Sequence, residues 1–221
     1  MITGERKPFP EIKASVAPYG KILVVGCATC VAECAAGGEK EVALLASQLR
    51  MDARNEGREI KIGEATIDRQ CIYEFVDQLT TIHDEYDVIL SLGCGAGVQA
   101  VAEVLQKHVI PALNTTFLGE TKEAGIWMEN CRACGDCKLD RFADVCPITR
   151  CAKNLLNGPC GGSKGGRCEV DPDAECAWQL IVDRLDKAGR LGSIDAVYPP
   201  VNWAKKEGKG PRKIVREDQR S

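Results

Sequence analysis

The chain has 221 residues, of which 44% are hydrophobic and 5% aromatic, and its formal net charge is −3. These values are typical of a globular protein of one or two domains, and neither the charge nor the few aromatic rings favour a nucleic-acid-binding surface. No run approaches 18 consecutive apolar residues, and the first 20 residues lack the apolar core of a secretory signal. The sequence therefore predicts a cytoplasmic protein without a membrane span.

Residues 1–19 are expected to form an N-terminal arm, followed by an α/β domain over residues 20–118. Apolar runs predict four buried strands, at residues 21–27, 59–67, 87–94 and 109–114. Apolar residues at helical spacing predict helices between these strands, at residues 39–51, 71–86 and 97–108. This alternation predicts a small flavodoxin-like domain, with a parallel sheet of about four strands covered on both faces.

Five cysteines lie at or just after the ends of these strands: Cys27, Cys30, Cys34, Cys71 and Cys94. The carboxyl ends of parallel strands meet at one edge of a sheet, where such sheets bind their ligands. The sequence predicts that all five thiols face this rim and that four of them hold a [4Fe–4S] cluster. Ordinary buried cysteines are the alternative reading for Cys71 and Cys94.

Three glycines surround Cys94, at Gly93, Gly95 and Gly97. They do not complete the dinucleotide-binding pattern G-x-G-x-x-G, because position 98 is valine. They are expected to allow a tight turn and the close approach of a cofactor. The sequence shows no Ser/His/Asp constellation and no paired carboxylates, so no catalytic residue is assigned.

Residues 119–192 are expected to form a cysteine-rich, metal-stapled domain with a C-terminal helix. This segment contains eight of the chain's 13 cysteines: Cys131, Cys134, Cys137, Cys146, Cys151, Cys160, Cys168 and Cys176. Cytoplasmic thiols stay reduced, so clustered cysteines there indicate metal rather than disulfides. The C-x2-C-x2-C spacing favours iron–sulfur over zinc, and the two histidines, His83 and His108, lie outside the segment.

The number of cysteines allows two four-cysteine sites in this segment and one near the strand ends. We expect two or three metal sites, mostly [4Fe–4S], with zinc possible at one four-cysteine set between Cys131 and Cys176. In two-cluster ferredoxins the cysteine before proline serves the other cluster. By that analogy Cys146, which precedes Pro147, would bind apart from the first three cysteines.

Residues 193–221 are expected to be a C-terminal tail. Its end is basic, which is typical of a solvated segment. Apolar side chains just before that end, from Tyr198 to Trp203, leave open a second interpretation, an arm that binds a partner subunit.

Two segments carry a resemblance to a known family. NCRACGDC through CAW, residues 130–178, resembles the cysteine-rich domain named for the C-terminal part of certain methylenetetrahydrofolate reductases, and the block at residues 157–170 is its most specific part. GCATCVAECAAGGEKEV, residues 26–42, resembles the start of the stand-alone MetV-type subunits. Together the two resemblances cover nearly the whole chain.

The resemblance implies a partner, a MetF-type flavoprotein that carries FMN in a TIM barrel and reduces methylenetetrahydrofolate in one-carbon (Wood–Ljungdahl type) metabolism. Such a barrel does not fit in this chain. The resemblance therefore implies a non-catalytic electron-transfer subunit whose clusters feed the flavin, with the upstream electron donor left open. A zinc-ribbon-like scaffold without a redox role, and a zinc-thiolate site that passes methyl groups, are the alternatives.

Overall fold

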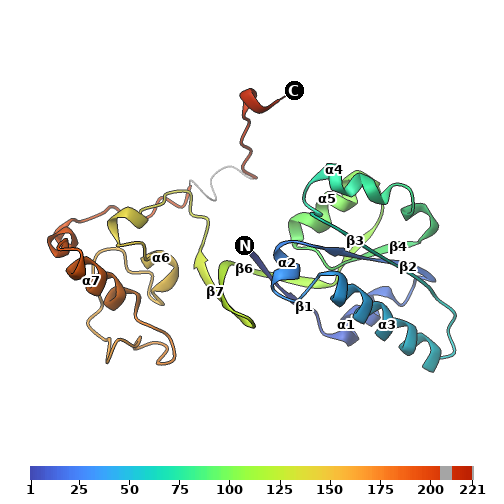
Figure 1. The fold of residues 1–221 in the computed structure, drawn as a ribbon, viewed down its shortest axis with the longest axis horizontal. Coiled ribbons are helices and arrows are strands. Elements are labelled where there is room, and N and C mark those ends of the chain that lie inside the picture. Colours follow the sequence, from blue (N-terminus) through green and yellow to red (C-terminus); the bar gives the residue numbers. More distant parts are fainter. Residues whose placement is uncertain (205–210, 221) are drawn as a thin grey trace. The chain divides into compact units, whose positions relative to one another are not determined.

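The computed structural model describes residues 1–204 and 211–220 and divides the chain into two compact units (Figure 1). Unit 1 is Met1–Met128 and unit 2 is Glu129–Ser221. Residues 119–128, expected in the cysteine-rich domain, thus lie in unit 1. Among the helices of the described ranges, none has both the length and the apolar character needed to cross a membrane.

Unit 1 contains the predicted parallel sheet. Its strands are β2 (Lys21–Cys27), β3 (Lys61–Ile67), β4 (Val88–Ser91) and β5 (Val109–Pro111). They lie in the order β3-β2-β4-β5, and every neighbouring pair is parallel. This confirms the α/β class, and the order is that of the first four strands of flavodoxin-type sheets.

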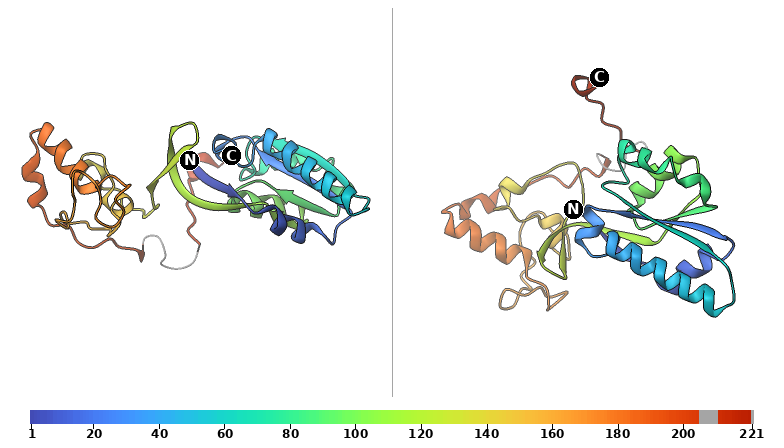
Figure 2. Two further views of the ribbon diagram at one scale, coloured as in Figure 1. Left: turned by 90° about the horizontal axis from the view of Figure 1, so that it is seen from below. Right: turned by 45° about the vertical axis from the view of Figure 1, so that its right-hand side comes forward.

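Helices cover both faces of this sheet (Figures 1 and 2). One face carries α1 (Phe9–Val16) and α3 (Glu39–Asn55), and the other carries α4 (Tyr73–Val76), the 3-10 turn η1 (Asp77–Leu79) and α5 (Gly95–Leu105).

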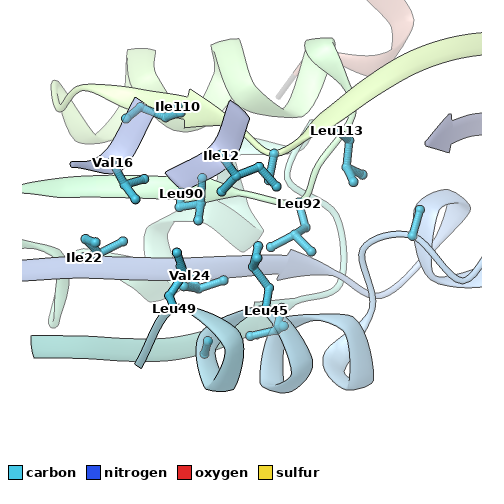
Figure 3. Packing of buried hydrophobic residues seen from close by; sticks show 14 of the residues in the cluster. Ile12, Val16, Ile22, Val24, Leu45, Leu49, Leu90, Leu92, Ile110 and Leu113 are labelled. Carbon is cyan, nitrogen blue, oxygen red and sulfur yellow. The ribbon is translucent and has the colours of Figure 1, made fainter. Parts of the chain in front are cut away.

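Alternation along β2 explains the two layers, because successive side chains of a strand point to opposite faces. Ile22 and Val24 pack on the α3 side, and Leu23 and Val25 on the α5 side. Figure 3 shows the first of these cores, with Leu45 of α3 beside the sheet.

A second sheet, missed by the sequence analysis, lies mostly in unit 1, and its last strand continues into the first residues of unit 2. It contains β1 (Ile2–Arg6), β6 (Leu113–Glu123) and β7 (Ile126–Cys131) in the order β1-β6-β7. β1 runs antiparallel to β6, with Arg6 opposite Leu113. The expected arm over residues 1–19 is therefore β1 and α1, which buries Ile12 and Val16 at helical spacing.

The helix expected over residues 71–86 is broken into α4, η1 and the 3-10 turn η2 (His83–Glu85). Thr80 and Thr81 interrupt it, since their hydroxyls donate to the carbonyls of Asp77 and Gln78. Such local bonds compete with helical ones.

Unit 2 has short elements and a small core. Its helical elements are η3 (Leu139–Arg141), α6 (Pro147–Arg150), α7 (Ala177–Lys187), η4 (Leu191–Asp195) and η5 (Glu217–Gln219). α7, orange in Figure 2, is the expected C-terminal helix. The core cluster of this unit consists of Phe142, Val145, Ala177, Trp178, Ile181 and Leu185.

The start of the tail packs on unit 2 itself. The Tyr198 ring lies edge-on to Phe142, with 5.4 Å between ring centroids. The Asn157 side chain bonds both the amide and the carbonyl of Tyr198, at 2.8 and 2.9 Å. Residues 205–210 and 221 of the proposed partner-binding tail lie outside the described residues.

Candidate metal centres

Four cysteines of unit 1 lie at or after the carboxyl ends of three adjacent strands, β2, β3 and β4. Cys27 ends β2, Cys30 opens the short helix α2 (Cys30–Glu33), Cys71 follows β3, and Cys94 is the N-cap of α5 after β4. We call these four the rim thiols. Cys71 is exposed, Cys30 and Cys94 are half-buried and Cys27 is buried, so the set extends from the core to the surface.

A fully buried side chain, Gln70, fixes the loop that carries Cys71. Its amide nitrogen donates to the carbonyl of Val25 on β2 at 3.0 Å, and its amide oxygen accepts from the Ser91 hydroxyl on β4 at 2.6 Å. The Ser91 oxygen in turn accepts from the Gly93 amide at 3.0 Å. This network ties three strand ends together and places Cys71 beside the turn that carries Cys94.

The glycines around Cys94 make room for Gln70. A Cβ at Gly93 would overlap the Gln70 amide, and one at Gly97 would lie 2.8 Å from the Gln70 Cβ. Gly95 meets nothing closer than the Thr115 hydroxyl, at 3.7 Å. Gly93 and Gly97, which were expected to make room for a cofactor, thus make room for the Gln70 side chain instead. The spacing of the glycines in the sequence did not indicate this role.

Replacing Gly97 with alanine is expected to lower the free energy of unfolding. Alanine favours a helix by about 1 kcal/mol over glycine, but overpacking a buried contact costs about 1–3 kcal/mol. Because Gln70 is held at both ends, we expect a net loss of roughly 1 kcal/mol. Urea unfolding measures it, and Gly95→Ala in the same helix is the matched control. Equal stability of the two variants would contradict the tight contact at Gly97.

Cys34 is set apart from the rim thiols. It is buried, and its Sγ accepts from the Gly4 amide at 3.4 Å and lies 3.5 Å from the Gly4 carbonyl oxygen and 3.6 Å from that of Val31. β1, unforeseen from the sequence, thus supplies its partners. Among the five thiols, Cys34 is thus the one whose sulfur contacts the backbone of β1.

In unit 2 one cavity gathers four cysteines. It has a volume of about 260 Å³, and its lining includes Cys131, Cys134, Cys137 and Cys146, which we call the first thiol set. The volume is roughly 20 times the ~10–15 Å³ that one water requires. Cys146 therefore lines the same cavity as the three cysteines of the C-x2-C-x2-C run, although the ferredoxin analogy predicts that it binds apart from them.

The backbone around the first thiol set turns toward the sulfurs. Ala133 and Gly135 both have positive φ, 50° and 79°, and the Ala133 amide donates to Cys131 Sγ at 3.3 Å. Cys146 is the N-cap of α6, whose first residue is Pro147. The buried amide oxygen of Asn130, which lines the cavity, has no hydrogen-bond partner among the described residues.

The other four cysteines line a smaller cavity, of about 20 Å³. They are Cys151, Cys160, Cys168 and Cys176, which we call the second thiol set. The eight cysteines are thereby divided into two sets of four.

A tight hairpin shapes the second thiol set. Lys164 and Arg167 form an antiparallel bridge across Gly165 and Gly166, which have φ of 57° and 79°. A two-residue loop with both φ positive strongly favours Gly-Gly, so the sequence did contain this signal. The amides of Cys168 and Cys176 bond the carbonyls of Ala174 and Gly166, at 3.0 and 2.8 Å, which holds these two cysteines on adjacent backbone.

Polar groups lie around the second thiol set. The Gly162 amide donates to Cys160 Sγ at 3.4 Å. Lys153 forms an ion pair with Glu169; this bond raises the pKa of Lys153, and the nearby Cys160 and Cys168 thiolates raise it further. The buried Ser163 hydroxyl lines the cavity and has no partner within the described chain, so it is available to a sulfur.

The thiols of each set share a space without converging on one point. In the part of the chain that the structure describes, no group of three or more His, Cys, Asp or Glu side chains is placed to hold a single metal ion. His83, whose Nδ1 lies 3.2 Å from the Leu79 carbonyl oxygen, and His108, which stacks near Tyr19, line neither cysteine cavity.

The similarity to known proteins lies mostly in unit 2. A family model described as methylene-tetrahydrofolate reductase C terminal matches residues 110–204, which include both thiol sets of that unit. No protein of curated function and no solved structure matches the chain. The match associates the chain with methylenetetrahydrofolate reductase through a segment similar to that family.

Proposed function

We propose that the chain is the iron–sulfur electron-transfer subunit of a methylenetetrahydrofolate reductase complex, a MetV-type partner of a MetF-type, FMN-carrying flavoprotein. The observation that carries the proposal is the cavity of the first thiol set, which lies within the residues similar to the reductase family. Iron–sulfur clusters, when bound, supply one-electron carriers whose potential the protein adjusts.

The first thiol set fits a cluster better than a single ion. A [4Fe–4S] cluster takes one thiolate on each of four irons, whereas zinc needs four ligands at about 2.0–2.3 Å from one point. The four cysteines line one cavity of about 260 Å³, which has room for a group larger than a single ion. The Ala133 amide already donates to one sulfur, a contact that would raise a cluster's reduction potential.

One observation favours a zinc site, with a structural role, at the second thiol set. The cavity that all four cysteines line, about 20 Å³, has room for roughly one water-sized species, and a neighbouring cavity of about 240 Å³ is lined by Cys160 and Cys176 alone of the four. Lys153 and Arg150 in its lining would offset part of the charge of four thiolates. A zinc-ribbon-like scaffold is therefore the second candidate for that part of the chain.

Metal analysis of the full chain, prepared anaerobically, tests the proposal. We expect a brown protein with iron and acid-labile sulfide in equal amounts, at about four of each per occupied cluster, and visible absorption that bleaches with dithionite. Zinc at one equivalent beside iron would place zinc at one set. A colourless protein with zinc and no sulfide would overturn the electron-transfer role.

The partner is tested by electron delivery. The dithionite-reduced chain, freed of excess reductant, is mixed with a MetF-type flavoprotein, and flavin bleaching is followed by stopped flow. We expect bleaching with the native chain and little with Cys134→Ala. Equal bleaching with both would contradict a path through the first thiol set.

A further inference from the structure

The rim thiols lie outside the residues that are similar to the reductase family, which begin at residue 110. Nothing in that similarity therefore assigns them a role. Their positions are set by the fold of unit 1, through the ends of β2, β3 and β4 and the start of α5. A metal site here would be separate from both thiol sets of unit 2.

The contacts of unit 1 bring the rim thiols together. Strands β3 and β4 flank β2, so residues that follow their carboxyl ends meet at one edge. Gln70 holds the Cys71 loop against β2 and β4. Cys27 Sγ lies 3.7 Å from the Asp68 carbonyl oxygen of the same loop, which ties Cys27 to it as well.

Electrostatics agree with this geometry. Partial burial raises the pKa of the Cys71 thiol, and the negative charges of Cys94, Cys27 and Cys30 raise it further. The Cys34 sulfur, by contrast, accepts from the Gly4 amide of β1.

We propose that Cys27, Cys30, Cys71 and Cys94 hold a [4Fe–4S] cluster in unit 1 and that Cys34 is a structural thiol that binds no iron. The assignment rests on the proposed iron–sulfur role of the chain. Exposed Cys71 leaves one corner of the site at the surface, where a redox partner can approach.

Two single variants of the full chain, prepared anaerobically, test the assignment. Cys71→Ala is expected to lose about four iron atoms and four sulfides relative to the native chain. Its fold should persist, since the residue is exposed. Cys34→Ala, the matched control, is expected to keep all of its iron. Loss of iron from Cys34→Ala with full retention in Cys71→Ala would overturn the ligand set.

Alkylation of the native chain gives a readout that needs no variant. Free Cys71 is exposed but its pKa is raised, so iodoacetamide is used at alkaline pH, where the thiolate that reacts is present. Cys71 should be protected in the iron-bound chain and modified after iron is extracted by a chelator. Mass spectrometry of its peptide follows the change. Rapid modification of Cys71 in the iron-bound chain would contradict ligation.

The outcomes separate the two proposals. If Cys134→Ala loses iron and Cys71→Ala does not, the iron–sulfur role stands and the site in unit 1 fails. If neither variant loses iron, both proposals fail.

Discussion

Cys134→Ala is expected to lose about four iron atoms per chain and to unfold part of unit 2. The first thiol set lines a wide cavity beside a small core. The free energy of metal binding at such a site therefore contributes directly to the stability of the folded unit. Iron analysis and near-ultraviolet circular dichroism, which reports the packing of Trp178, measure the two effects. Unchanged iron and an unchanged spectrum would contradict ligation by Cys134.

Additivity tests how the eight cysteines are divided. Adding Cys146→Ala to Cys134→Ala should remove no further metal, because both residues line the same cavity. Adding Cys151→Ala should remove a second metal, although Cys151 is only five residues from Cys146, since it lines the other cavity. The reverse pattern would support the ferredoxin-like arrangement, in which Cys146 belongs to the other site.

Gln70→Leu is expected to destabilise unit 1 by about 2–4 kcal/mol, because it leaves two buried polar groups without their partner. These are the Val25 carbonyl and the Ser91 hydroxyl. The loop that carries Cys71 should also loosen, so iron should be lost from unit 1 if the rim thiols bind it. Urea unfolding and iron content measure the two effects.

Gln78→Leu is the matched control for Gln70→Leu. It makes the same substitution eight residues along, at an exposed side chain of η1. Its stability and iron content should stay close to those of the native chain. A similar loss in both variants would mean that leucine itself, and not the Gln70 network, disturbs unit 1.

The parallel sheet was predictable because its strands are short apolar runs buried on both sides. Runs such as KILVVGC leave few alternatives to a central strand, and β2 has the predicted bounds, Lys21–Cys27. β1 was not predictable in the same way. ITGER has little apolar character, and its pairing with β6 depends on a contact more than 100 residues away.

The missed strand explains why the five thiols of unit 1 looked equivalent in sequence. Cys30 and Cys34 are four residues apart in one turn, and only the position of β1 distinguishes them. Gln70 was missed for a similar reason, since a buried glutamine has no sequence signature until its partners on β2 and β4 are known.

In unit 2, spacing indicated metal but could not group the ligands. Cys146 and Cys151 stand at the two ends of α6, a helix of four residues. That single turn directs them to different cavities. The Gly165–Gly166 hairpin, by contrast, was readable from the Lys-Gly-Gly-Arg pattern.

The unequal cores of the two units have a consequence for how the chain matures. Unit 1 has apolar layers on both faces of its sheet and can reach its fold from its own side chains. Unit 2 has one small apolar cluster around Trp178 and Ile181. Its eight cysteines lie in the segment from residue 131 to residue 176. With metal bound as proposed, maturation has two stages, and the second waits for metal delivery. In a cell short of iron, the newly made chain would combine a folded unit 1 that lacks its cluster with a protease-accessible unit 2, so its abundance would follow the iron supply.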